Sequence, residues 1–164
     1  KDANYYPLTT EFELKKGDNV VDFTVKPYVR FGQPTFTYDA ASKKIIATCE
    51  VQVTDPAQTP TLNEVRLCCY TDCFVGASFN NCKSDAGAVA SNVQFDADGK
   101  ATVTVAIDTQ DPANNIEFKY ERVHYVRVAA LATGAGVNSS SRYNYTQTYS
   151  IALDGSAAVE YTKW

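Results

Sequence analysis

The chain has 164 residues, of which 45% are hydrophobic and 12% aromatic, and its formal net charge at pH 7 is -4. This length and composition are typical of one globular domain with an ordinary core, and they exclude an intrinsically disordered chain. The negative charge repels nucleic-acid phosphates, so nucleic acid is not an expected partner, and no apolar run is long enough to predict a membrane span.

The first patterned segment is residues 11–25, EFELKKGDNVVDFTV. Apolar residues recur at every second position on both sides of a Lys-Gly-Asp-Asn turn, which predicts a β-hairpin. Pro27 then removes a backbone donor and holds Lys26 extended, so we expect a domain boundary at this point.

Strand candidates then recur between turn signals. Residues 34–55 predict two strands joined at 39–42, the second with Cys49 pointing into a core. Alternation in LNEVRLCCY predicts one face with Val65, Leu67 and Cys69 and an opposite face with Arg66, Cys68 and Tyr70. Residues 71–92 have no sustained period, which indicates a long loop or a loop with a short edge strand.

The second half of the chain continues in the same way. Residues 93–107 predict a hairpin with its turn at DADGK, and HYVRVAAL predicts a central strand with His124 pointing inward. The last strand carries Tyr143, Tyr145 and Tyr149 on one face, where we expect core or cross-strand packing. Because no segment has a helical period, we predict an all-β fold: an immunoglobulin/fibronectin type III-like antiparallel β-sandwich, preceded by a β-hairpin.

The five cysteines do not form a metal-binding pattern. Four of them lie within residues 68–82 without a C-x-x-C pair, and the only histidine is His124, so neither a metal nor another cofactor is expected. One interpretation is that the thiols are small buried hydrophobes. The other is a disulfide between Cys73 and Cys82, which bracket a loop, if the compartment is oxidising.

Catalytic patterns are also lacking. The single histidine faces inward, no G-x-S-x-G motif occurs, and the acids Glu64, Glu117 and Glu121 are expected on the solvated surface, so we predict a protein that is not an enzyme. A hydrolase with dispersed acids is the weaker alternative.

Two segments carry oxygen ligands of the kind that calcium prefers. They are the DADG turn at 96–99 and the group Asp108, Asp111, Asn114 and Asn115. Asp and Asn also favour turns for local reasons, so we interpret both segments as turns rather than calcium sites.

A carbohydrate site is the binding hypothesis that the loops favour. In a sandwich of this topology residues 71–92 and 108–119 share a pole, and the first of these loops contains Phe74, Phe79, Asn80 and Asn81. Aromatic faces stack on sugar C–H surfaces while amides bind hydroxyls, so we select these four residues as carbohydrate-binding candidates. The alternative is that Phe74 and Phe79 pack beneath the loop as a small satellite core.

Two resemblances extend this interpretation. HYVRVAALATGAG resembles the penultimate strand of fibronectin type III domains, with His124 in place of the usual Tyr. The segments YYPLTTEFELKKGDNVVDFTVKPYVRF, VRLCCYTDCFVG, YVRVAALA and RYNYTQTYSIAL are similar to the domain-of-unknown-function family 3823 (DUF3823), surface lipoproteins of Bacteroidetes glycan-uptake systems.

This second resemblance implies a domain organisation. Residues 1–27 would be the terminal hairpin of a preceding transthyretin-like (carboxypeptidase-regulatory-like) domain, and residues 28–164 would form the fibronectin III/Ig-like sandwich. The sequence has no Met, so we expect a processed product or fragment whose signal peptide or lipid-anchor cysteine lies upstream. The resemblance implies export and anchoring at the outer membrane.

The functional hypothesis combines the loops with this resemblance. We expect a non-enzymatic cell-surface accessory protein of a glycan-uptake system, which binds polysaccharide or neighbouring outer-membrane uptake proteins through loops at one pole. The alternative is a structural spacer or adhesive module without a small-molecule site.

Overall fold

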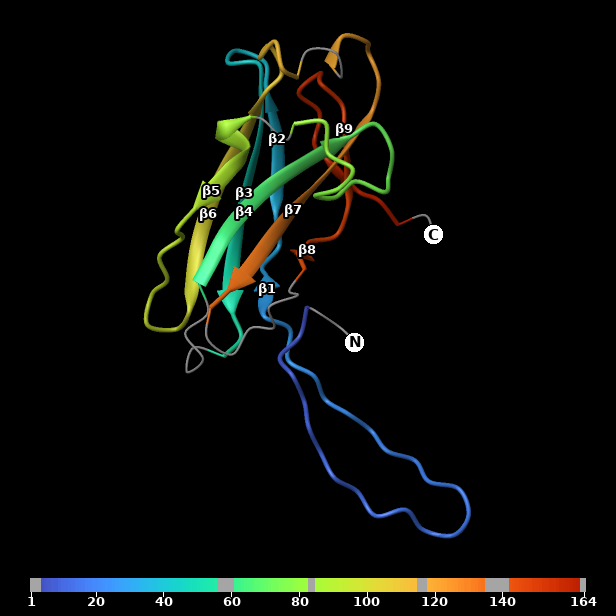
Figure 1. Ribbon diagram of the computed structural model, residues 1–164. Helices are drawn as coiled ribbons and strands as arrows, with labels where there is room; N and C mark the ends of the chain where they lie inside the picture. The colour runs from blue at the N-terminus through green and yellow to red at the C-terminus, as the bar shows by residue number, and fades with distance from the viewer. Residues whose placement is uncertain (1–3, 56–60, 83–84, 115–117, 135–141, 163–164) are drawn as a thin grey trace.

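The computed structural model describes residues 4–55, 61–82, 85–114, 118–134 and 142–162, which form two antiparallel sheets packed face to face (Figure 1). The first sheet contains β1 (Val29–Phe31), β2 (Thr35–Asp39), β3 (Lys44–Val53) and β6 (Lys100–Asp108). The second contains β4 (Thr61–Tyr70), β5 (Val89–Ser91), β7 (His124–Thr133), β8 (Asn144–Tyr145), β9 (Tyr149–Ile151) and β10 (Val159–Glu160). A short 3-10 helix, η2 (Ala86–Ala88), precedes β5.

Each sheet is built around long central strands. In the first, β1 and β2 pair with successive parts of one edge of β3, and β6 pairs with the other edge. In the second, β4 and β7 pair along their length, β5 lies outside β4, and β8 and β9 share the far edge of β7. The predicted all-β, two-sheet sandwich is therefore confirmed.

The core lies between the two sheets and follows the predicted alternation. Ile45, Leu67, Ile107 and Val126 are completely buried there, one from each long strand. Burying a side chain such as that of Leu67 away from water contributes roughly 1.5–3 kcal/mol to the stability of the folded state. His124 is also completely buried, as its parity predicts, with its ring 5.0 Å from that of Phe118.

The last strand departs from the predicted alternation because it is interrupted between β8 and β9. Tyr145 pairs with Ala129 and Tyr149 with Val126, so the chain advances four residues while β7 advances three. One extra residue reverses which side chains face the core. Tyr149 therefore packs inside, against Phe36 at 5.0 Å, whereas Tyr145 faces outward, and the prediction of one shared face was wrong.

Residues 7–25 form an extended arm that projects away from the sandwich (Figure 1). Its base is fastened where the Tyr6 N–H donates to the Lys26 carbonyl oxygen at 2.9 Å and the two chain segments meet in a Tyr5–Pro27 bridge. No strand is assigned within residues 7–25, so the predicted β-ladder of residues 11–25 is not formed.

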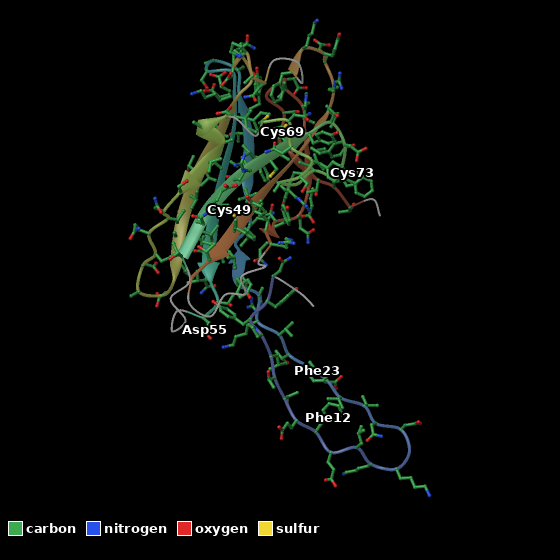
Figure 2. All side chains as sticks on the ribbon, in the orientation of Figure 1. Phe12, Phe23, Cys49, Asp55, Cys69 and Cys73 are labelled. Atoms are coloured by element: carbon green, nitrogen blue, oxygen red, sulfur yellow. The ribbon has the colours of Figure 1, made fainter. Side chains whose placement is uncertain are left out.

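The apolar side chains of the arm lack a surface to pack on. Phe12 and Phe23 contact each other edge to face at 6.5 Å, yet they are 53% and 54% exposed (Figure 2). A two-stranded ribbon without a third layer is at best marginally stable in water, which explains why the alternation does not produce a regular ladder.

A buried carboxylate fastens the connection between β4 and β6. Asp85 accepts hydrogen bonds from the backbone N–H groups of Gly87 and Asp108 at 2.9 and 3.0 Å and from the Asn114 amide at 2.9 Å. The backbone approaches β6 so closely that a Cβ on Gly87 would lie 2.9 Å from the Ala106 carbonyl oxygen. The loops after β4 and β6 therefore share a pole, as predicted.

All five cysteines are free thiols, so the disulfide predicted between Cys73 and Cys82 is absent. Cys82 lies in the core, whereas Cys73 is half-exposed on the outer side of the loop, where it hydrogen-bonds with the Tyr161 hydroxyl (Figure 2). Burial raises the pKa of Cys49 to about 11 and that of Cys68 to about 12. Both groups are therefore protonated at neutral pH and inert as nucleophiles.

Among the described residues, no helix has the length and apolar character needed to cross a membrane.

Candidate functional site

The loop at residues 71–82 folds back over the outer face of the second sheet, the face turned away from the first (green in Figure 1). Val75 is completely buried there against Cys68 of β4 and Ala129 of β7. The Asn80 side-chain oxygen accepts from the N–H groups of Cys69 and Cys82, both at 3.1 Å. The loop is therefore anchored by a small core of its own.

The four candidates chosen from this loop separate into two groups. Phe74 and Phe79 project into solvent with 68% and 57% of their surface exposed, so neither packs beneath the loop; Val75 fills that position. Asn80 is 5% exposed and engaged with the backbone, which corrects its choice as a sugar ligand. Asn81 is half-buried, and its backbone N–H donates to the Cys69 carbonyl oxygen.

A hollow of about 450 Å³ lies beside this loop on the outer face. It is lined by parts of β4, β8, the loop and the first described residues: Asn4, Arg66, Ala77, Ser78, Arg142, Tyr143 and Tyr145. Apart from Ala77, each of these side chains has a hydrogen-bonding group, and two of them are aromatic. The hollow therefore combines ring faces with converging polar groups, the usual composition of a small-molecule site.

A hydrogen-bonded group of three side chains borders the hollow. The Glu64 carboxylate accepts a hydrogen bond from the Arg66 guanidinium at 2.5 Å and another from the Tyr143 hydroxyl at 2.9 Å. Burial opposes ionisation of Glu64, but these two hydrogen bonds outweigh it and hold its pKa below the ordinary value. Burial, and then the bond to Glu64, raise the pKa of Tyr143 to about 12. The carboxylate is therefore ionised at neutral pH and fixes the ring of Tyr143.

The second tyrosine of the hollow is held by an arginine. The Arg127 guanidinium carbon lies 3.8 Å from the ring centroid of Tyr145, a cation–π contact, and the Tyr145 hydroxyl accepts from the Ala77 N–H at 3.2 Å. Gly76 lets the loop backbone lie against this stack, since a Cβ there would approach the guanidinium to 3.0 Å. Desolvation lowers the pKa of Arg127. One face of Tyr145 is thus covered by Arg127.

Sequence reasoning placed Tyr143 and Tyr145 in the wrong environment. A strict alternation groups them with Tyr149, and only the extra residue between β8 and β9 places them on the outer face. The signal that could have identified this break is Thr146-Gln147-Thr148, a polar run inside an otherwise aromatic strand. The Thr146 hydroxyl accepts the Val128 N–H at 3.0 Å and its own N–H donates to the Val128 carbonyl oxygen, which holds the bulge in place.

A second hollow, of about 520 Å³, lies at the pole between residues 109–110, 118–123 and 152–154. Its exposed ring is Tyr120, flanked by the Lys119 and Arg122 side chains at 5.7 and 5.4 Å from the ring centroid. Its acids are Glu121 and Asp154, whereas Glu64 is bound to Arg66 beside the other hollow, so the predicted acids Glu64 and Glu121 lie at different sites. Glu117 lies outside the described residues.

The two turns with calcium-type ligands use their oxygens on their own backbone. Asp96 accepts from the N–H groups of Asp98 and Lys100, and Asp111 accepts from that of Ala113. Among the described residues, no three His, Cys, Asp or Glu side chains are placed to hold a metal ion. Asn115 is outside the described residues. The interpretation of 96–99 as a turn fits this geometry.

Comparisons with known proteins add a structural relationship. A putative carbohydrate binding protein from Bacteroides uniformis superimposes with a TM-score of 0.69 at 29% identity, covering 93% of this chain and 70% of that one. A DUF3823 family protein from Parabacteroides merdae matches with a TM-score of 0.56 at 18% identity, covering 76% of this chain and 52% of that one. Another, from Bacteroides ovatus, matches with a TM-score of 0.56 at 19% identity, covering 85% and 63%.

These matches define the chain as a two-sheet sandwich of the kind found in proteins of Bacteroidetes. More narrowly, its fold is DUF3823-like, as the sequence resemblance implied. The chain spans between half and two thirds of the two DUF3823 proteins. No protein-family model matches the sequence, and no curated protein matches it significantly.

Proposed function

We propose that this protein binds carbohydrate on the outer face of its second sheet, in the hollow bordered by Tyr143 and Tyr145. The observation that carries the proposal is the hollow itself, in which two tyrosine rings lie 6.1 Å apart at 38° to each other among amide, hydroxyl and guanidinium groups. Sugars present apolar C–H faces and directional hydroxyls together, and this lining complements both.

Three further observations support a surface-binding role. The loop that closes one side of the hollow carries the exposed ring of Phe79, which lies 6.2 Å from that of Tyr70 and extends the aromatic surface. The loop is anchored by Val75 and Asn80, so the site needs little ordering when a ligand binds. A structurally similar protein from Bacteroides uniformis is itself described as a putative carbohydrate binding protein.

The cellular setting is part of the same proposal. We place the protein among the non-enzymatic accessory proteins of a glycan-uptake system, exported and anchored at the outer membrane, with neighbouring uptake proteins as partners. This setting follows from the resemblance to DUF3823 proteins. Export is tested by fractionating the native organism, where recovery only in the cytoplasm would contradict it.

The arm supports a division into two domains. We propose that residues 1–27 complete a preceding transthyretin-like domain, because the arm exposes a row of large apolar side chains that alternate like those of a strand: Leu8, Phe12, Leu14, Val21, Phe23 and Val25. A longer version of the chain with its preceding residues should bury Phe12 and Phe23. Fluorescence of 8-anilinonaphthalene-1-sulfonate, which binds exposed apolar surface, should be lower for that longer version than for residues 1–164.

Affinity gel electrophoresis tests the binding proposal. The protein should be retarded in gels that contain at least one soluble polysaccharide from a panel of dextran, glucomannan, arabinogalactan, xylan, polygalacturonate and chondroitin sulfate. Tyr143→Ala removes a ring of the hollow and should abolish retardation, and Phe79→Ala should weaken it. Tyr120→Ala is the matched control, since Tyr120 and Phe79 are both 57% exposed and Tyr120 belongs to the other hollow.

Three results would each contradict part of the proposal. Loss of retardation in Tyr120→Ala but not in Tyr143→Ala would move the site to the pole. No retardation with any polysaccharide would favour the alternative, a structural spacer. Turnover of a chromogenic glycoside would contradict the non-enzymatic part. Thermal unfolding of each variant establishes that it is folded before the gels are compared.

A further inference from the structure

The charged groups around the hollow are mainly positive, in contrast to the chain as a whole. Three guanidinium groups, those of Arg66, Arg127 and Arg142, line it or lie behind its rings, with the carboxylate of Glu64 beside them. Counted over the described residues alone, these are three positive charges and one negative charge, on a protein whose formal net charge is -4. A local field of this sign in a partly desolvated hollow attracts anions.

The one carboxylate is already engaged within this group. Oε1 of Glu64 accepts hydrogen bonds from both Arg66 and Tyr143. The ion pair with the Arg66 guanidinium balances the negative charge of this carboxylate. Asp72, the acid of the neighbouring loop, accepts the Phe74 N–H at 3.0 Å in its own turn. Among the described residues, neither acid forms an ion pair with Arg127.

Arg127 is the arginine of this group whose positive charge has the least compensation among the described residues. Among the described residues it forms no ion pair with a carboxylate, and its Nε is buried without a hydrogen-bond partner. A charged group taken out of water is costly unless it is paired. Its stacking on Tyr145 supplies part of the compensation, and an anion held elsewhere in the hollow would supply more.

We infer that the hollow selects an anionic sugar, whose carboxylate or sulfate group lies toward Arg142 and Arg66 while its ring rests against Tyr143 and the uncovered face of Tyr145. The inference rests on the proposed function and names the class of carbohydrate. Arginine suits the role because its planar, permanently charged fork matches carboxylate and sulfate oxygens. Ser78 and Asn4 also line the hollow and add a hydroxyl and an amide group to it.

Paired polymers that differ only in charge provide the test. Polygalacturonate is compared with its fully methyl-esterified form, which has the same backbone without the carboxylates, and dextran sulfate is compared with dextran. Affinity electrophoresis and isothermal titration calorimetry should show binding to the charged member of at least one pair and at least tenfold weaker binding to its neutral partner. Retention of polygalacturonate alone identifies a uronate site, and retention of dextran sulfate alone identifies a sulfate site.

Two variants with the same change of charge locate the effect. Arg142→Gln removes one exposed arginine of the hollow and should weaken binding of the charged polymer by about tenfold, the usual effect of losing one charge-assisted hydrogen bond. Arg122→Gln removes an exposed arginine of the other hollow and should leave the affinity within twofold of the original. Equal weakening by both variants would show attraction to net charge rather than a site and would overturn the inference.

The outcomes also separate this inference from the function on which it rests. Equal binding to charged and neutral partners, lost in Tyr143→Ala, would overturn the anionic preference and leave carbohydrate binding in place. Absence of binding to all four polymers and to the rest of the polysaccharide panel would overturn both.

Discussion

The arm and strand β3 have the same alternating pattern but opposite environments. In β3, Ile45, Ala47 and Val51 are completely buried against the second sheet. In the arm, Phe12 and Phe23 alternate in the same way and are more than half exposed. The difference lies in the partner, because β3 has β6 on one edge and a facing sheet, whereas each half of the arm faces only the other half.

This comparison separates what a strand pattern encodes from what stabilises a strand. Alternation specifies which side chains share a face, but burial requires a second layer to cover that face. The following predictions test the contrast, beginning with the largest expected effect.

Leu67→Ala should destabilise the sandwich by about 2–5 kcal/mol, because it leaves a cavity at a completely buried position of β4. Urea unfolding followed by tryptophan fluorescence or circular dichroism would measure the change. A loss below 1 kcal/mol would contradict the close packing of the two sheets.

Asp85→Ala should cost about 2 kcal/mol, because three buried N–H donors lose their acceptor. The Asp85 anchor of this connection is buried, whereas the hydrogen bonds by which Asn19 holds the turn of the arm are exposed. Asp85→Asn keeps one carbonyl oxygen and should lose less. Hydrogen exchange at Gly87 and Asp108 should accelerate in the alanine variant, and unchanged exchange would contradict the anchor.

Glu64→Gln should cost about 1 kcal/mol at neutral pH, since the ion pair with Arg66 is only partly shielded from solvent. The folded-state pKa of Glu64 is depressed, so its stabilisation is complete above the ordinary pKa of Glu and is lost as pH falls through the folded-state value. The two proteins should therefore converge in stability at low pH. Glu11→Gln on the exposed arm is the control, and a constant difference at every pH would contradict the assignment.

Phe12→Ala should change the free energy of unfolding by less than about 0.5 kcal/mol, because the ring is exposed and contacts mainly Phe23. The same substitution in a longer chain that includes the preceding residues should cost several times more. Equal, small effects in both chains would contradict the proposed domain division.

Most of the fold could be predicted from the sequence because the long strands follow a period of two, interrupted in β4 by a register shift between Leu62 and Glu64. The inward positions of β3, β4 and β7 are those that the alternation selects, including Cys49 and His124 and the opposite orientations of Cys68 and Cys69. In these strands both flanking strands and the facing sheet enforce one register, so local pattern and tertiary packing agree.

The candidate site was less predictable because it depends on two departures from regular structure. The bulge after Tyr145 reverses the parity of the last strand, and the loop at 71–82 places Val75 rather than Phe74 or Phe79 against the sheet. Neither has a periodic signal. The hollow also unites Asn4, Arg66 and Arg142, which are distant in the sequence and lie together only in the folded chain.

The pairing of the long strands determines when this protein can fold during synthesis. β3 pairs with β6, as at Ile45 and Ile107, and β4 pairs with β7, as at Cys69 and Val126. Each of these two ladders can form only after its second strand, β6 or β7, has been translated. Closing such long loops is slow. The arm leaves the ribosome before the strands of the sandwich, so until its apolar side chains are covered, nascent chains should depend on holding chaperones more than a domain with local pairing would.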